Sequence, residues 1–98
     1  MTPLVITEPA KDDLRNIWIY TAENSYVEYA DGQLDGLLAG CELLCLQPEM
    51  GTERTDIVRD LRFFPVGRFN IYYRMQENTL FVVHVIDAAR DAKNINFQ

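Results

Sequence analysis

Residues 61–74 read LRFFPVGRFNIYYR, and this stretch decides the fold. Its aromatic and aliphatic residues favour β-strands, and Pro65-Val66-Gly67 interrupts them with residue types that favour a turn. We therefore predict a β-hairpin with strands over residues 61–64 and 68–75. The second strand alternates between an apolar face, formed by Phe69, Ile71, Tyr73 and Met75, and a polar face, formed by Arg68, Asn70, Tyr72 and Arg74.

The segments around this hairpin complete a small sheet. Residues 79–86 are almost uninterrupted apolar residues, which predicts a central strand covered on both faces, joined to the hairpin by a turn at residues 76–78. A short apolar run at residues 4–6 predicts a first strand. We expect residues 52–60 to form a polar loop and residues 87–98 a polar tail, short and helical or irregular.

Two helices are predicted between the first strand and the hairpin. Thr7 can cap the first helix, which the apolar spacing of Ala10, Leu14 and Ile17 carries from about residue 8 to 22. The second helix fits residues 26–46. The order is β-α-α-β-β-β, so we predict a single α+β domain over residues 1–98, with an N-terminal helical hairpin packed on a small antiparallel sheet.

Three glycines in the second helix need an explanation. Gly32, Gly36 and Gly40 follow one another at four-residue spacing on the side that we assign opposite the core, and each costs about 0.5–1 kcal/mol relative to alanine. Either a partner's backbone or a second copy of the chain approaches this side closely, or nothing selected against the glycines.

The charge is unevenly distributed. Residues 1–50 hold two basic and nine acidic residues, a net of −7, whereas residues 51–98 hold seven basic and six acidic residues, a net of +1. The acidic first half should repel DNA and RNA, so direct nucleic-acid binding is disfavoured. The absence of a basic-then-apolar leader and of a long apolar run leads us to expect neither secretion nor a membrane span.

Catalytic and metal-binding signatures are missing from the sequence. Cys41 and Cys45 lie one helical turn apart, and we interpret them as reduced core residues of a cytoplasmic protein; a metal site is not expected. Ser25 is the only serine, and His84 lies inside an apolar strand, where we interpret it as a partly buried structural residue. Asp12-Asp13, Asp31 and Asp35 are interpreted as solvated helix surface. We predict that the protein is not an enzyme and needs no cofactor.

The arginines allow two interpretations. Arg62, Arg68, Arg74 and Arg90 could cluster at one edge of the sheet. They could pair with the chain's own Asp60, Asp87 or Asp91, or they could bind the carboxylates of a protein partner or the phosphates of a nucleic acid.

Five blocks of sequence, taken together and in order, resemble the ParE toxins of the RelE/ParE superfamily. They are the helix from Ala10 to Tyr20, the helix end from Cys41 to Gly51, the stretch Leu61 to Arg68, Ile71-Tyr72-Tyr73-Arg74, and Val85 to Asp91. The resemblance implies a toxin of a type II toxin–antitoxin system. Such a toxin poisons DNA gyrase and is neutralised, as a hetero-oligomer, by a ParD-like antitoxin.

The sequence also departs from the family pattern, and this keeps two alternatives open. At the end of the last strand His84 and Asp87 replace the family's usual arginine and histidine, so a degenerate, non-toxic antitoxin-binding module is the first alternative. The second is a ribosome-dependent mRNA endonuclease that resembles RelE. Against it, Asn70 lies about where a catalytic arginine is expected, and no tyrosine follows Tyr73.

The resemblance and the surface pattern together give candidate contact residues. For the antitoxin these are Trp18, Tyr29, Gly36, Leu43, Phe64, Arg68 and Arg74. For the target they are Arg90, Lys93 and Phe97.

Overall fold

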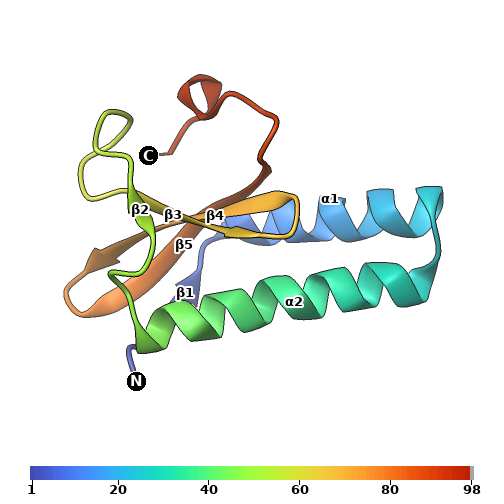
Figure 1. Ribbon diagram of the computed structural model, residues 1–98, viewed down its shortest axis with the longest axis horizontal. Coiled ribbons are helices and arrows are strands. Elements are labelled where there is room, and N and C mark those ends of the chain that lie inside the picture. The colour runs from blue at the N-terminus through green and yellow to red at the C-terminus, as the bar shows by residue number, and fades with distance from the viewer. Residues whose placement is uncertain (98) are drawn as a thin grey trace.

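The computed structural model describes residues 1–97, and its elements follow the predicted order with one added strand. The elements are β1 (Leu4–Ile6), α1 (Glu8–Asn24), α2 (Val27–Leu46), β2 (Thr52–Glu53), β3 (Arg62–Val66), β4 (Phe69–Gln76), β5 (Thr79–Asp87) and the short 3-10 helix η1 (Ala92–Asn94). The strands form one sheet in the order β1-β5-β4-β3-β2, antiparallel except for the parallel pair β1 and β5. The two helices lie side by side against this sheet (Figure 1). The predicted α+β architecture is confirmed.

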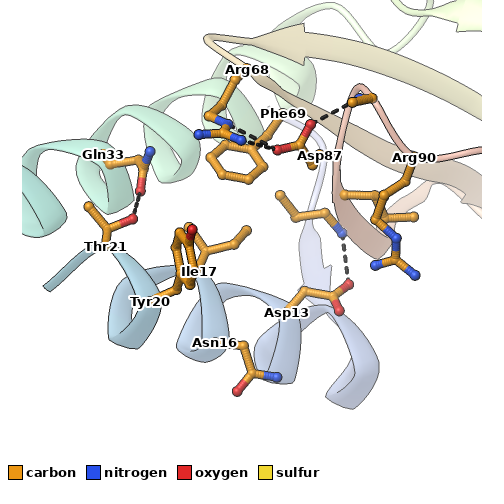
Figure 2. A pocket seen from close by; sticks show the side chains of 13 residues that line it. Asp13, Asn16, Ile17, Tyr20, Thr21, Gln33, Arg68, Phe69, Asp87 and Arg90 are labelled. Carbon is orange, nitrogen blue, oxygen red and sulfur yellow. Dashed lines mark hydrogen bonds and ion pairs between the residues drawn. The ribbon is translucent and has the colours of Figure 1, made fainter. Parts of the chain in front are cut away.

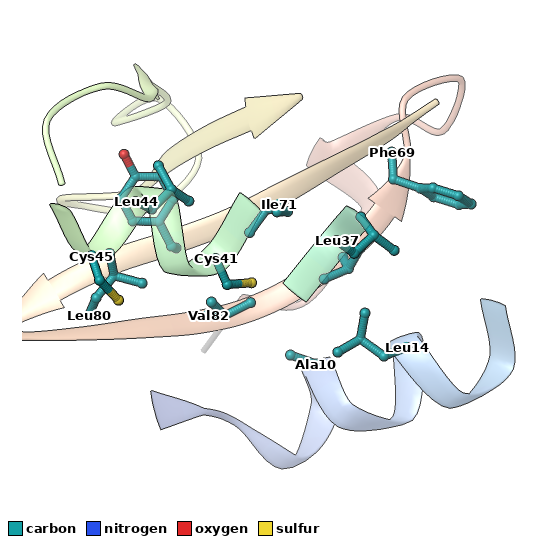
Figure 3. Packing of buried hydrophobic residues seen from close by; sticks show 12 residues of the cluster. Ala10, Leu14, Leu37, Cys41, Leu44, Cys45, Phe69, Ile71, Leu80 and Val82 are labelled. Atoms are coloured by element: carbon teal, nitrogen blue, oxygen red, sulfur yellow. The ribbon is translucent and has the colours of Figure 1, made fainter. Parts of the chain in front are cut away.

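The main core lies between the helices and the sheet (Figure 3). Thr7 caps α1 as predicted, because its Oγ1 accepts a hydrogen bond from the Ala10 N–H (3.4 Å) and donates one to the Val82 carbonyl (2.9 Å), which joins the helix start to β5. The buried residues of this core are Ala10, Leu14, Leu37, Cys41, Leu44, Cys45, Phe69, Ile71, Tyr73, Leu80, Val82 and Val85. Both cysteines are buried free thiols, in agreement with their predicted place in the core.

A second, smaller core lies on the other face of the sheet, under the C-terminal segment. A register shift between Tyr72 and Tyr73 places these residues opposite His84 and Val82, so β5 accommodates Val83 as an extra residue. The buried residues of this second core are Leu61, Tyr72, Val83, Ile86, Ala92 and Phe97. This core covers the second face of β5, as the sequence predicts, but the contribution of the tail is not predicted.

The hairpin turn differs from the prediction. β3 continues through Pro65 and Val66, and Val66 pairs with Phe69, so Gly67 and Arg68 form the turn. Gly67 has a φ of +57°, which suits the first position of a two-residue hairpin turn. Pro65 is tolerated in the strand because β3 extends past the end of β2, which pairs only with Arg62 and Phe63, so the proline lies on an open edge.

The prediction of a polar loop at residues 52–60 is wrong in part. Thr52 and Glu53 form β2, and Ile57 and Val58 pack against the second core.

A second correction concerns Gly40, which is buried in the interface between α2 and the sheet and does not lie on the side of the helix opposite the core. A Cβ on Gly40 would lie 2.8 Å from Val66 Cγ2, so this glycine lets α2 approach the sheet closely. Within residues 1–97, no helix has the length and apolar content needed to cross a membrane.

Candidate binding groove

Two hollows adjoin where the helical hairpin passes the tip of the β3–β4 hairpin. The first, of about 610 Å³, lies between α1 and the end of β5 and is called the α1 hollow (Figure 2). The second, of about 620 Å³, lies between the first half of α2 and the hairpin tip and is called the α2 hollow. Gln33, Arg68 and Phe69 border both hollows, so we treat the two as one groove.

The α1 hollow combines an apolar wall with polar groups at its rim. Ile17 and Tyr20 rise from α1, and Phe69 comes from the sheet (Figure 2). Val85 of β5 also lines the hollow. The Tyr20 side chain is 65% exposed, although its large ring lies next to this apolar surface. Exposed aromatic rings beside a hollow are typical of sites that bind another protein.

An ion pair lies on the Phe69 side of the α1 hollow. Arg68 donates from Nε and Nη2 to Oδ2 of Asp87, at 2.9 and 2.6 Å, and its guanidinium lies 5.7 Å from the centre of the Phe69 ring (Figure 2). The Ala89 N–H donates to the other oxygen of Asp87 at 2.9 Å. This N–H and the Arg68 guanidinium together hold the pKa of Asp87 below its usual value.

Arg90 lines the same hollow and is exposed. Among the described residues, no carboxylate lies within ion-pair distance of its side chain. Arg90 therefore offers an uncommitted cation at this end of the groove, whereas Glu28 provides an anion at the α2 end.

Two glycines, Gly32 and Gly36, line the α2 hollow. A Cβ on Gly32 or Gly36 would meet no atom within 4 Å, in contrast to Gly40, so the packing of this chain does not require either glycine. Tyr26 and Tyr29 stand beside them on the rim, with their rings 5.8 Å apart, and Tyr29 is 53% exposed. The surface is thus apolar, open and free of the side chains that would fill it.

The structure brings only some of the predicted contact residues together. Tyr29, Gly36 and Arg68 line the α2 hollow, and Arg90 lines the α1 hollow. Trp18 lies elsewhere: its indole N–H donates to Asp31 at 2.8 Å and links the two helices. Leu43 is exposed further along α2, and Phe64 is half-buried against the main core.

The remaining predicted residues do not belong to the groove. Lys93 is exposed in η1, but Phe97 is only 5% exposed and stacks 4.8 Å from Tyr72, so its ring is not presented to a partner in this conformation. Arg74 lies half-buried, and its buried Nε has no hydrogen-bond partner among the described residues.

The arginines do not form the single cluster that the sequence allowed. Arg62 donates to the carbonyls of Glu49 and Gly51, at 3.1 and 2.7 Å, and pairs with Glu53, so it fastens the loop after α2. Arg68 pairs with Asp87 as described. For these two arginines, pairing within the chain is the interpretation that the structure supports.

Several groove residues were missed by the sequence reasoning. Tyr20, Gln33, Phe69 and Asp87 are among them. Of these, Tyr20 could have been predicted from the sequence, because it is a large aromatic residue next to the apolar positions of α1. The prediction that Asp13 is solvated surface is wrong, since its Oδ2 accepts a hydrogen bond from the Val85 N–H at 2.9 Å.

Comparison with known protein families assigns this fold. The family model described as ParE toxin of type II toxin-antitoxin system, parDE, matches residues 4–92. The chain belongs to the ParE toxin family. Toxin ParE3 of Caulobacter vibrioides is 26% identical over 87 residues, which cover 89% of this chain and 87% of that protein.

A solved structure has the same fold as this ParE-family chain. The structure of the chromosomal ParDE TA system from P. aeruginosa superposes with a TM-score of 0.78 at 18% identity, over 89% of this chain and 96% of the other. Within the described residues, no group of three or more His, Cys, Asp or Glu side chains could hold a metal ion.

Proposed function

We propose that this ParE-family toxin is neutralised by a ParD-like antitoxin whose C-terminal segment lies in the groove between the helical hairpin and the sheet. The observation that carries the proposal is the groove itself, since an apolar hollow flanked by exposed Tyr20, Tyr26 and Tyr29 suits a segment that folds on binding. The hollows are lined largely by apolar and aromatic side chains, so we expect apolar burial to supply most of the affinity.

The proposed action is inhibition of DNA gyrase in the cytoplasm, without an enzymatic step. Family membership supports this reading. Exposed Arg90 and Lys93 are the residues we assign to the target contact. An mRNA endonuclease is less well supported, because the sheet face opposite the helices is largely filled by an apolar core and an endonuclease needs positioned polar groups for proton transfer.

The first experiment expresses the chain alone and together with the small gene beside it, and assays gyrase supercoiling with the purified protein. Growth arrest that the neighbouring gene relieves, with supercoiling inhibited, supports the proposal. Unimpaired growth would instead indicate a non-toxic binding module. Arrest with active gyrase and cut transcripts would indicate an mRNA endonuclease.

The second experiment locates the antitoxin on the groove. Tyr29→Ser removes an exposed aromatic ring from the α2 hollow, and Leu46→Ser removes an exposed apolar side chain from the far end of the same helix. We expect Tyr29→Ser to weaken antitoxin binding by about 2 kcal/mol, as for an interface hot spot, and Leu46→Ser to leave it almost unchanged. Equal effects in a calorimetric titration would exclude the α2 hollow as the docking site.

A further inference from the structure

His84 connects three parts of the molecule that are far apart in the sequence. Its Nδ1 lies 2.6 Å from Oδ2 of Asp13 in α1, and its Nε2 lies 2.9 Å from the carbonyl oxygen of Asn96 near the C-terminus. The same Asp13 oxygen accepts the Val85 N–H. The imidazole ring therefore lies between a helix on one side and the C-terminal segment on the other, and its side chain is only 18% exposed.

Both ring nitrogens face hydrogen-bond acceptors. A carboxylate and a backbone carbonyl can only accept, so each contact needs an N–H on the ring. A neutral imidazole carries one N–H and would direct the lone pair of its other nitrogen at an oxygen. With Asp13 ionised, the doubly protonated ring is the form that satisfies both contacts.

The His84 ring is one of the groups that hold the C-terminal segment in place. Phe97 packs edge-on to His84, with the ring centres 5.4 Å apart, and also against Tyr72. Ala92 and Phe97 complete the second core from this segment. Loss of the His84–Asn96 contact would therefore loosen the end of the chain and expose part of that core.

We propose that His84 is a pH-dependent latch, which in its protonated form fastens the C-terminal segment to Asp13 of α1 and releases that segment when it loses a proton. The latch rests on these contacts alone and is independent of the proposed toxin function. It determines whether the segment that carries Lys93 and Phe97 is docked on the sheet or free.

The groups around the ring define the direction of the effect. Asp13 faces it from α1 and Tyr72 lies opposite it in β4, while the C-terminal segment presents the Asn96 carbonyl and the uncharged Phe97 ring. Asp13 is the acidic side chain among these groups. Docking is thus complete when both ring nitrogens carry a proton and weakens when one of these protons is lost.

The test follows amide hydrogen exchange of residues 92–97 in the intact protein at about pH 5.5 and about pH 8.5, corrected for the intrinsic effect of pH on exchange. We expect protection of these amides to fall by at least about tenfold at the higher pH, because the hydrogen bond from His84 to the Asn96 carbonyl is lost and Phe97 is held less firmly. Asp13→Asn should abolish this pH dependence. Asp12→Asn is the matched control and should preserve the pH dependence, since Asp12 lies next to Asp13 in α1 but forms an exposed ion pair with Arg15.

A second measurement does not depend on any variant. Nitrogen NMR of the His84 ring reports how many ring protons are present while the segment is docked. Two N–H protons in the docked state support the latch. A constant protection across the pH range, a neutral ring with a fully protected segment, or a pH dependence that survives Asp13→Asn would each overturn it.

Discussion

The hydroxyl of Tyr73 joins β4 to the loop that follows α2: it donates a hydrogen bond to the Pro48 carbonyl at 2.6 Å and accepts one from the Gly51 N–H at 2.9 Å. Gly51 is buried beneath the ring, and a Cβ there would overlap the Tyr73 hydroxyl. Burial raises the pKa of Tyr73, which keeps the hydroxyl protonated and able to donate. This contact fixes the end of α2 against the sheet.

Tyr73→Phe should destabilise the fold. The substitution removes only the hydroxyl, and it leaves the Pro48 carbonyl and the buried Gly51 N–H without their partner. We expect a loss of about 1–3 kcal/mol in the free energy of unfolding, measured by urea denaturation. Tyr20→Phe is the control, because the exposed Tyr20 should change stability by less than about 0.5 kcal/mol. Equal losses for the two variants would show that the buried contact contributes nothing specific.

The glycines of α2 should respond in opposite directions to alanine. Gly36→Ala adds a methyl group to open space and removes the entropic cost of a helical glycine, so we expect a gain of about 0.5–1 kcal/mol. Gly40→Ala would place its Cβ 2.8 Å from Val66 Cγ2 and 3.1 Å from Ile71 Cδ1, and overpacking of this kind costs about 1–3 kcal/mol. Thermal unfolding compares the two variants, and stabilisation by both would contradict the close approach at Gly40.

A larger side chain at Gly36 separates folding from binding. Gly36→Leu should fold at least as stably as the natural chain, because nothing lies within 4 Å of its Cβ position. The leucine would occupy the α2 hollow, so we expect antitoxin affinity to fall at least about tenfold. Ala39→Leu, on an exposed part of α2 outside the groove, is the matched control. Undiminished affinity of Gly36→Leu would place the antitoxin elsewhere.

The fold was predictable from the sequence where a local pattern acts alone. The apolar spacing of Ala10, Leu14 and Ile17 and the alternation of Phe69, Ile71 and Tyr73 each determine which face is buried, and the structure confirms both. The turn was misplaced because Pro65 signals a turn locally, whereas its position on an open edge removes the usual penalty for proline in a strand. Local propensity could not reveal which strand lies at the edge.

The groove was less predictable because it depends on elements distant in the sequence. The predicted contact residues Tyr29, Gly36 and Arg68 do line one hollow. Phe69 is predicted only as a core residue, and Asp87 only as one of three possible partners for the arginines, yet both line the groove. The sequence places Phe97 among the candidate target contacts, but its ring fills the second core. A tail of mostly polar residues gives no sign that its aromatic ring folds back onto the sheet. Such contacts follow from tertiary packing.

The Arg68–Asp87 pair should be measurable as a pH effect. The Ala89 N–H and Arg68 lower the pKa of Asp87 in the folded state, so the contribution of Asp87 to stability is present above the carboxyl's ordinary pKa and is lost as the pH falls through its lowered value. Arg68→Gln should raise the pKa of Asp87 toward its ordinary range, while the Ala89 N–H keeps it somewhat below. Carbon-detected NMR titration of the Asp87 carboxyl measures this. An unchanged pKa would show that Arg68 does not interact with Asp87 in solution.

The thiol of Cys41 should be inert in the folded protein. Burial, reinforced by the neighbouring Cys45 and Glu42, raises the pKa of Cys41 to about 11, and the side chain is shielded inside the main core. At about pH 8 roughly one thiol in a thousand is then ionised, and only the thiolate reacts with a disulfide reagent. We expect very slow labelling of the native protein by an aromatic disulfide and rapid labelling in urea, with Cys45→Ala used to assign the signal to Cys41. Labelling of this variant as fast in the folded state as in urea would mean that α2 opens readily from the sheet, because Cys41 lies with Leu37 and Leu44 on the buried face of the helix.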